Sequence, residues 1–183
     1  MDALAAESFL NVEHRVFGLR LLPLSLGHAF TLEAVANPFF FGRLGTAAEL
    51  RLAAWVCARE PLAVPKTTTL RFALWRWWTR HLKLPIEAEK WKAYVADYVA
   101  PPQLWNKQRK AGEEESKPSR IPNSVNTVVR LMRLGMSERQ AWATPVGMST
   151  WYEAAGYETE TGNKLDIVTD SERLAILKAK ARQ

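Results

Sequence analysis

The sequence contains few of the residues that build cross-links or metal sites. Among its 183 residues, cysteine occurs once and histidine occurs three times. One cysteine cannot form an intramolecular disulfide, and the cysteine and histidines lack the short, paired spacing of zinc ligands. The sequence therefore excludes a disulfide scaffold, and we predict no metal site.

Patterns typical of active sites are also missing. The nine glycines are never grouped as a phosphate-binding loop or a dinucleotide-binding turn requires. Cys57 lies among apolar residues at helical spacing, which favours an unreactive buried thiol over a nucleophile. We interpret His28 and His81 as structural residues, and the acidic run at 113–115 as a solvated charge block. We therefore predict no catalytic residue, no cofactor and no enzymatic activity.

Long apolar runs are absent as well. No stretch approaches the roughly 18 uninterrupted apolar residues of a membrane-spanning helix. Residues 1–11 contain Asp2 and Glu7 but no lysine or arginine, unlike the basic start of a secretory signal peptide. We expect a cytoplasmic protein in a reducing compartment, with no membrane partner.

The sequence is rich in tryptophan and in positive charge. It has eight tryptophans, and its 25 lysines and arginines against 19 acids give a net charge of +6. A hydrophobic share of 48% is sufficient for a folded core. The positive charge is concentrated at 66–83, whereas residues 138–172 are net acidic.

Helical spacing of apolar residues predicts a mainly α protein. Ser25 is a candidate N-cap, Thr46 with Glu49 forms a capping-box pattern, and Ser137 precedes a short helix. We expect at most one short extended element, at 15–22. The predicted helices cover 26–36, a segment from Thr46 to before Pro61, 69–83, 85–99, 125–134, 137–143 and 149–156, with a last helix after Thr169 or Asp170.

For two of these helices, the sequence also predicts end residues and which residues share a face. At 85–99, Pro85 suits the first turn, and the pattern places Trp91, Tyr94 and Tyr98 on one face with Glu87 pointing elsewhere. Asn123 or Ser124 is expected to cap the helix at 125–134, and Gly135 is expected to end it in a left-handed conformation.

The polar segment after the fourth helix predicts a division of the chain. Residues 106–120 contain no large apolar residue, so they cannot bury enough surface to offset their ordering entropy. We predict a small helical N-terminal bundle at 1–102, a mobile charged linker at 103–120 and a smaller helical C-terminal region at 121–183.

The segment 66–83 has no acidic residue, and its helix is amphipathic. One arc is apolar and is interrupted by Arg71, and Arg76, Arg80 and Lys83 form a basic stripe on the other side. The apolar arc holds Leu70, Leu74, Trp77, Trp78 and Leu82. We call Arg71, Arg76, Arg80 and Lys83 the basic patch. Phosphate and base binding by such a helix is one interpretation. We favour a core helix with a solvated charged face, because the tryptophans would point away from the cations. A helix-turn-helix at 128–152 is disfavoured by Pro145 and by the acidic charge around it.

Three consecutive phenylalanines lie between a proline and a glycine, at Phe39, Phe40 and Phe41. Three adjacent rings cannot all enter one core from a regular element. Either this loop tucks under the helices, or some rings form an exposed patch for a protein partner.

Several patches resemble one protein family. Residues 21–28 (Leu-Leu-Pro-Leu-Ser-Leu-Gly-His), a helix ending at Asn-Pro-Phe and a helix through Trp55-Val56-Cys57 resemble the N-terminal part of small proteins encoded in phage and prophage tail modules. Residues 136–142 (Met-Ser-Glu-Arg-Gln-Ala-Trp), followed by Pro145, Gly147 and 151–155 (Trp-Tyr-Glu-Ala-Ala), resemble their C-terminal part. The family is that of the tail-assembly chaperones.

This resemblance implies a small helical protein in the bacterial host cytoplasm. Such a protein would keep an apolar tape-measure protein soluble and help tail-tube proteins assemble around it. We expect apolar helices of the tape-measure partner to bind an aromatic groove formed by Phe39, Phe40, Phe41, Trp75, Trp77 and Trp78. The alternatives are a nucleic-acid-binding protein that uses the basic patch, and a structural component of the virion.

Overall fold

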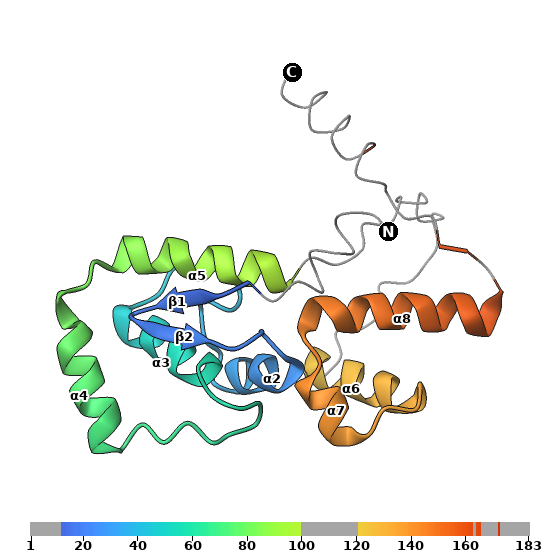
Figure 1. The fold of residues 1–183 in the computed structure, drawn as a ribbon, viewed down its shortest axis with the longest axis horizontal. Coiled ribbons are helices and arrows are strands. Elements are labelled where there is room, and N and C mark those ends of the chain that lie inside the picture. The colour runs from blue at the N-terminus through green and yellow to red at the C-terminus, as the bar shows by residue number, and fades with distance from the viewer. Residues whose placement is uncertain (1–11, 100–120, 163, 166–171, 173–183) are drawn as a thin grey trace.

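The computed structural model describes residues 12–99, 121–162, 164–165 and 172 (Figure 1). Helices dominate these residues, beside one two-stranded sheet, which confirms the predicted mainly α fold. The predicted linker and the predicted helix after Thr169 or Asp170 lie outside the described residues. The division of the chain into an N-terminal and a C-terminal region stays a prediction.

A β-hairpin occupies the region where an extended element was predicted. Strands β1 (His14–Val16) and β2 (Leu19–Leu21) pair antiparallel, with Val16 opposite Leu19. The two residues between them, Phe17 and Gly18, have φ angles of 48° and 74°. Positive φ at both central residues is typical of the tight turn that matches the twist of a hairpin. Because glycine adopts this conformation freely and phenylalanine does not, surrounding contacts must hold Phe17.

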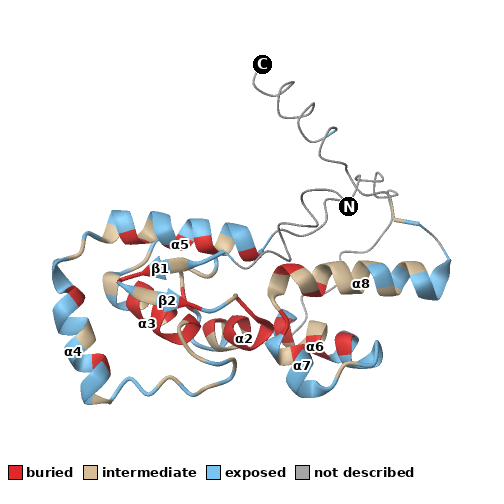
Figure 2. Cartoon of the chain, in the orientation of Figure 1, coloured by how far each residue is buried: buried red, intermediate tan, exposed pale blue. Residues whose placement is uncertain are grey.

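The N-terminal core surrounds α3. Helix α2 (Leu26–Ala34) and helix α3 (Ala47–Cys57) begin at the predicted caps, because Ser25 accepts from the His28 amide and Thr46 accepts from the Glu49 amide. Most of α3 is buried beneath the hairpin and α5 (Figure 2). The core joins these elements through buried apolar side chains, including Phe17, Leu24, Leu50, Cys57, Trp91 and Tyr94.

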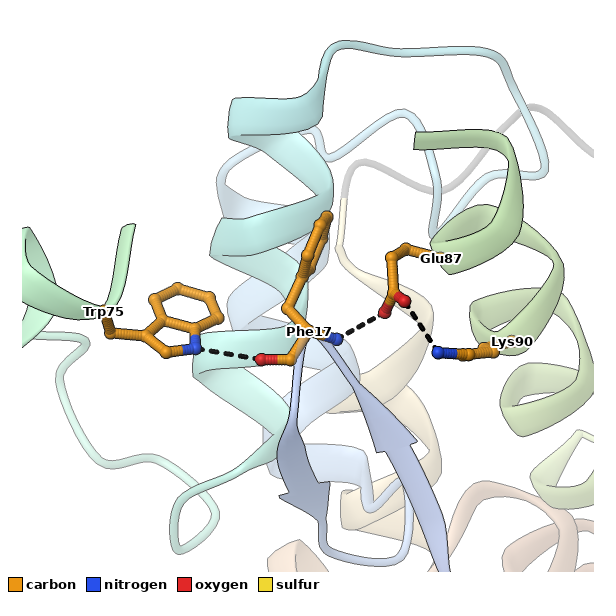
Figure 3. A network of polar contacts seen from close by, with 4 residues as sticks. All are labelled: Phe17, Trp75, Glu87 and Lys90. Atoms are coloured by element: carbon orange, nitrogen blue, oxygen red, sulfur yellow. Dashed lines mark hydrogen bonds and ion pairs between the residues drawn. The ribbon is translucent and has the colours of Figure 1, made fainter. Parts of the chain in front are cut away.

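Helix α5 (Leu84–Tyr98) begins near Pro85, as predicted. Its buried face contains Glu87 together with Trp91, Tyr94 and Tyr98. The expectation that Glu87 points away from this face was therefore wrong. The Glu87 carboxylate accepts a hydrogen bond from the buried Phe17 amide and pairs with Lys90 Nζ at 2.7 Å (Figure 3). A buried carboxylate is tolerated when such partners satisfy it.

Helix α4 (Leu70–Trp78) continues into a short 3-10 helix, η1 (Thr79–His81). The α-helix is therefore shorter than the predicted span of 69–83, because Thr69 serves as its N-cap and Leu82 is already extended. In Figure 1, α4 lies at the end of the molecule opposite α8.

Helices α6 (Asn123–Arg133), α7 (Glu138–Ala143) and α8 (Val146–Thr161) pack near α2. Leu26 from α2 joins Val128, Leu131 and Ala141 in their buried cluster. The backbone of α2 also bonds to the α7–α8 turn, from the Leu26 amide to the Thr144 carbonyl oxygen at 3.0 Å.

The observed ends of these helices can be compared with the predicted caps and bounds. Gly135 has a φ of 94°, as expected after α6. The predicted α6 cap was wrong, because Pro122 holds that position and the Ser124 hydroxyl bonds to the Glu33 carboxylate instead. Helix α7 begins at the predicted Ser137 cap, and α8 extends beyond the predicted 149–156 at both ends.

Candidate functional site

One side of α4 holds this helix to the protein. Phe72 and Trp75 form ring contacts with Trp55 of α3, with centroids 5.0 and 5.2 Å apart. The Trp75 indole N–H also donates to the Phe17 carbonyl oxygen at 3.1 Å (Figure 3). One helical turn later, Thr79 is buried and accepts two hydrogen bonds from Arg51. These contacts fix which side of α4 faces inward.

The opposite side of α4 is apolar and exposed. Its four large side chains have exposed fractions of 75% for Leu70, 57% for Leu74, 60% for Trp77 and 65% for Trp78. We call these four residues the α4 face. Figure 2 shows most of this helix as exposed.

The expectation that this arc packs in the core was therefore wrong for these four residues, whereas Leu82 packs partly buried against the core. Large apolar residues occur on both sides of α4, so periodicity alone could not choose the buried side. The side with Phe72 and Trp75 is inward because those residues meet Trp55 and Phe17. The side with the exposed tryptophans finds no such partners in the core.

The basic patch borders the α4 face. Arg71, Arg76, Arg80 and Lys83 are all exposed. At about 100° per residue, Arg71 falls next to Trp78, between the exposed and the buried side, whereas Arg76 falls about 100° from Trp77 and closer to the buried Phe72. The Arg80 guanidinium lies 5.1 Å from the centroid of the Trp77 ring, within range of a cation–π contact.

Two arginines of α3 and its C-terminal end extend this positive surface, and the sequence analysis missed both. Arg51 has only 9% of its surface exposed, and its hydrogen bonds go to the Thr79 hydroxyl and carbonyl oxygens at 3.2 and 3.0 Å. The Arg59 guanidinium stacks over the Trp55 ring, with 3.7 Å from its carbon to the centroid. The burial of Arg51 has no signal in the local sequence, because its partner Thr79 lies 28 positions later, whereas Arg59 contacts Trp55 four positions earlier.

These cations have no acidic partner among the described residues. Burial lowers the pKa of Arg51 and of Arg59, and the positive charges of Arg76 and Arg71, respectively, lower these pKa values further. Ion pairs between described side chains involve other residues: His14–Asp97, Arg15–Glu13, Lys90–Glu87, Lys92–Glu89 and Arg130–Glu153. Buried and clustered charges are normally paired, so this surface is suited to an external anion.

The three phenylalanines divide between core and surface. Phe39 and Phe40 pack partly buried against the N-terminal core, and Phe41 is exposed. Asn37 holds the loop, donating to the Glu49 carbonyl oxygen and accepting from the Phe39 amide. The ring contacts found within the described part of the chain join Phe40 to Phe41 but neither to the α4 face. Trp75, the remaining predicted groove residue, points inward.

Cys57 and His28 have the structural roles predicted for them. Cys57 is fully buried, and burial raises the pKa of its thiol to about 12. His28 is also buried; its Nε2 lies 2.6 Å from the Arg59 carbonyl oxygen, and its Nδ1 lies 3.3 Å from the Ser25 amide. Burial lowers the pKa of His28.

Two hollows on the surface of the described residues are lined by neither Cys57 nor His28. One, of about 520 Å³, lies between α6 and α8 and is lined by Arg130, Leu134, Glu153 and Tyr157 among others. The other, of about 370 Å³, lies between Pro61, Leu62 and α7. The described residues contain no group of three or more side chains suited to hold a metal ion, and none of their helices is long and apolar enough to cross a membrane.

Comparison with known proteins did not find a significant match to this chain. No family model matches the chain, and no curated protein sequence or solved structure matches it significantly. The α4 face and its surrounding arginines are therefore the basis of the functional proposal.

Proposed function

We propose that this protein is a non-enzymatic assembly chaperone that binds an apolar helical segment of a partner protein through the α4 face. The observation that carries the proposal is the exposure of Leu70, Leu74, Trp77 and Trp78, each more than half accessible. Their spacing of four, three and one residues aligns them along one side of a helix. Such a row is the pattern by which one amphipathic helix binds another.

The arrangement suits a chaperone for a simple physical reason. An apolar segment that awaits assembly would otherwise aggregate, and an exposed apolar face can cover it reversibly. The resemblance to tail-assembly chaperones supports a tape-measure protein as that partner, with tail-tube proteins assembling around it in the bacterial cytoplasm. The exposed Phe41 would add a second contact for a longer segment.

Co-expression with a tape-measure protein tests this proposal. We expect the intact chain to raise the soluble fraction of the tape-measure protein, and the double variant L70S/L74S to abolish this increase. The matched control is L44S/V64S, which removes two exposed apolar side chains outside α4. F41S measures the contribution of the phenylalanine loop. If L70S/L74S protects the partner as well as the intact chain does, the α4 face is not the binding site.

Binding of single-stranded nucleic acid is the second candidate. It is favoured by the cation–π pair of Arg80 and Trp77 on the exposed side of α4, because stacking platforms beside cations bind bases and phosphates together. This function predicts that affinity for a labelled oligonucleotide falls steeply with added salt, and that R76Q/R80Q reduces the slope. An affinity that does not change with salt would exclude it.

A further inference from the structure

We infer that α4 is a hinged arm that separates from α3, and that apolar helices of the partner enclose the separated arm from both of its apolar sides. The separation is a property of the fold by itself, whereas its coupling to the partner rests on the proposed function. Three features of the contact between α3 and α4 favour separation: buried donors without acceptors, like charges that face each other, and flexible connections at both ends of α4.

Two hydrogen-bond donors are buried without an acceptor at this contact. They are the indole Nε1 of Trp55 and the Nη1 of Arg59, whose guanidinium lies over the Trp55 ring. Phe72 and Trp75 of α4 cover the same ring, with centroids 5.0 and 5.2 Å away. A buried donor without an acceptor is unfavourable. When α4 moves away, the Trp55 ring is uncovered and its N–H can bond to water, so separation removes part of this cost.

Positive charges face each other across the same contact. Burial lowers the pKa of Arg51, and the nearby charge of Arg76 lowers it further; Arg59 has the same relation to Arg71. Arg51 and Arg59 belong to α3 and the segment after it, whereas Arg71 and Arg76 belong to α4. The ion pairs between described side chains include none of these four arginines. Their mutual repulsion therefore acts to push α4 away from α3.

Helix α4 is held to the fold by ring contacts and by two sets of hydrogen bonds. The Trp75 indole N–H donates to the Phe17 carbonyl oxygen, and Arg51 donates to Thr79 just after the helix. The chain can bend at both ends of α4, because residues 58–69 contain no helix or strand and Leu82 is extended (Figure 1). Elements with few buried contacts open at a lower free energy than the whole fold. We therefore expect α4 to separate while the core stays folded.

Separation gives the partner a larger apolar surface. The docked helix presents only the α4 face, because Phe72 is 8% exposed and Trp75 is half-buried. Once α4 is released, these two rings become accessible on its other side. A partner that covers both sides binds the released arm more tightly than the docked one, and such a difference in affinity shifts the equilibrium. Partner binding and separation are therefore coupled.

Exchange of indole protons with heavy water tests the separation in the natural chain. Trp75 and Trp91 each donate an indole N–H to a backbone carbonyl oxygen, at 3.1 and 3.2 Å, but Trp91 lies in the core and is 1% exposed. In assigned proton–nitrogen NMR spectra, we expect the indole protons of Trp55 and Trp75 to exchange together, and about tenfold or more faster than that of Trp91. Equal exchange of all three would show that α4 separates only in global unfolding, which overturns the inference.

Charge reversal tests the repulsion between α4 and α3. R76E places a carboxylate near Arg51, so we expect it to slow the exchange of the two indole protons roughly fivefold, the effect of turning one like-charge contact into an ion pair. The matched control is R80E, which puts the same charge near the same end of α4 but next to an exposed tryptophan. Circular dichroism checks that both variants retain their helices. Equal slowing by both variants, or by neither, would overturn the role of the like charges.

A synthetic two-helix peptide, with leucine and isoleucine stripes and neutral polar positions elsewhere, tests the coupling. At saturating concentration, we expect it to speed the exchange of the Trp55 indole proton about tenfold or more, because the enclosed arm leaves this ring uncovered. Binding without a change in Trp55 exchange would overturn the coupling and leave the proposed function standing. Absence of binding would overturn the proposed function and the coupling, but not the separation of α4, which is measured without peptide.

Discussion

Trp75 donates its indole N–H to the carbonyl oxygen of Phe17, which lies 58 positions earlier in the sequence. The amide of the same Phe17 donates to Glu87 of α5 (Figure 3). One turn residue in a left-handed conformation therefore holds α4 on one side and α5 on the other. Through Trp75, this contact also sets the orientation that leaves the α4 face exposed.

Replacing Trp75 tests this anchor. W75F keeps a ring against Trp55 but removes the indole N–H, so we expect the free energy of unfolding to fall by about 1 kcal/mol. Urea unfolding followed by circular dichroism measures the change. The matched control is W77F on the exposed side of α4, which should change stability by less than about 0.5 kcal/mol. Equal effects of the two substitutions would contradict the observed orientation of α4.

The buried Glu87 should matter more for stability than its exposed neighbour. E87A leaves the buried Phe17 amide without an acceptor, which should lower the free energy of unfolding by about 1–3 kcal/mol. E89A removes an exposed ion pair with Lys92 and should have an effect of about 0.5 kcal/mol or less. Chemical denaturation of both variants gives the comparison. A larger loss for E89A would show that Glu87 does not hold the hairpin turn.

Protonation of His28 should destabilise the fold in mild acid. Burial lowers the pKa of His28 in the folded protein below its ordinary value of 6.5, so the unfolded chain takes up a proton first as the pH falls. The stabilisation from neutral His28 is complete above about pH 6.5 and is lost progressively toward the lowered folded pKa.

A pair of pH series measures this effect. The free energy of unfolding of the natural chain should decrease between about pH 7 and pH 5, with a slope of up to about 1.4 kcal/mol per pH unit from this one group. H28Q lacks the titrating ring, so the difference in stability between the two proteins should become smaller at low pH. A constant difference across this range would show that His28 titrates alike in both states.

Cys57 should be unreactive while the protein is folded. Burial raises the pKa of its thiol to about 12, so the reactive thiolate is scarce at neutral pH and the sulfur is inaccessible. Because the chain has one cysteine, a disulfide reagent such as dithionitrobenzoate reports on Cys57 alone. Labelling should be slow in buffer and become rapid and stoichiometric in urea. Rapid labelling under native conditions would contradict the burial of this residue.

Features that depend on neighbouring residues were well predicted. The caps at Ser25, Thr46 and Ser137 bond to amides three residues away, and a pattern of that length is visible in the sequence. The left-handed Gly135 is equally local. The α6 cap was missed because the Ser124 hydroxyl bonds instead to Glu33, a residue 91 positions away.

The candidate site was predicted less well than the helices. The basic patch was identified correctly as a set of exposed residues, because charged side chains at helical spacing seldom lie inside. The two supporting arginines, Arg51 and Arg59, were not identified. The contact of Arg51 with Thr79 arises from the packing of the α4 segment beside α3, and the sequence around Arg51 does not mark it. Arg59 contacts Trp55, only four positions earlier, and this short spacing was not considered.

The sequence by itself determined the helical class, the caps that begin the helices and the concentration of tryptophan and positive charge at 66–83, because each depends on residue type and short spacing. Only the tertiary structure decided which side of α4 is buried. Both sides carry large apolar residues, so burial alone favours neither. Trp55 and Phe17, distant in the sequence, favour the side with Phe72 and Trp75, and this choice leaves Leu70, Leu74, Trp77 and Trp78 exposed.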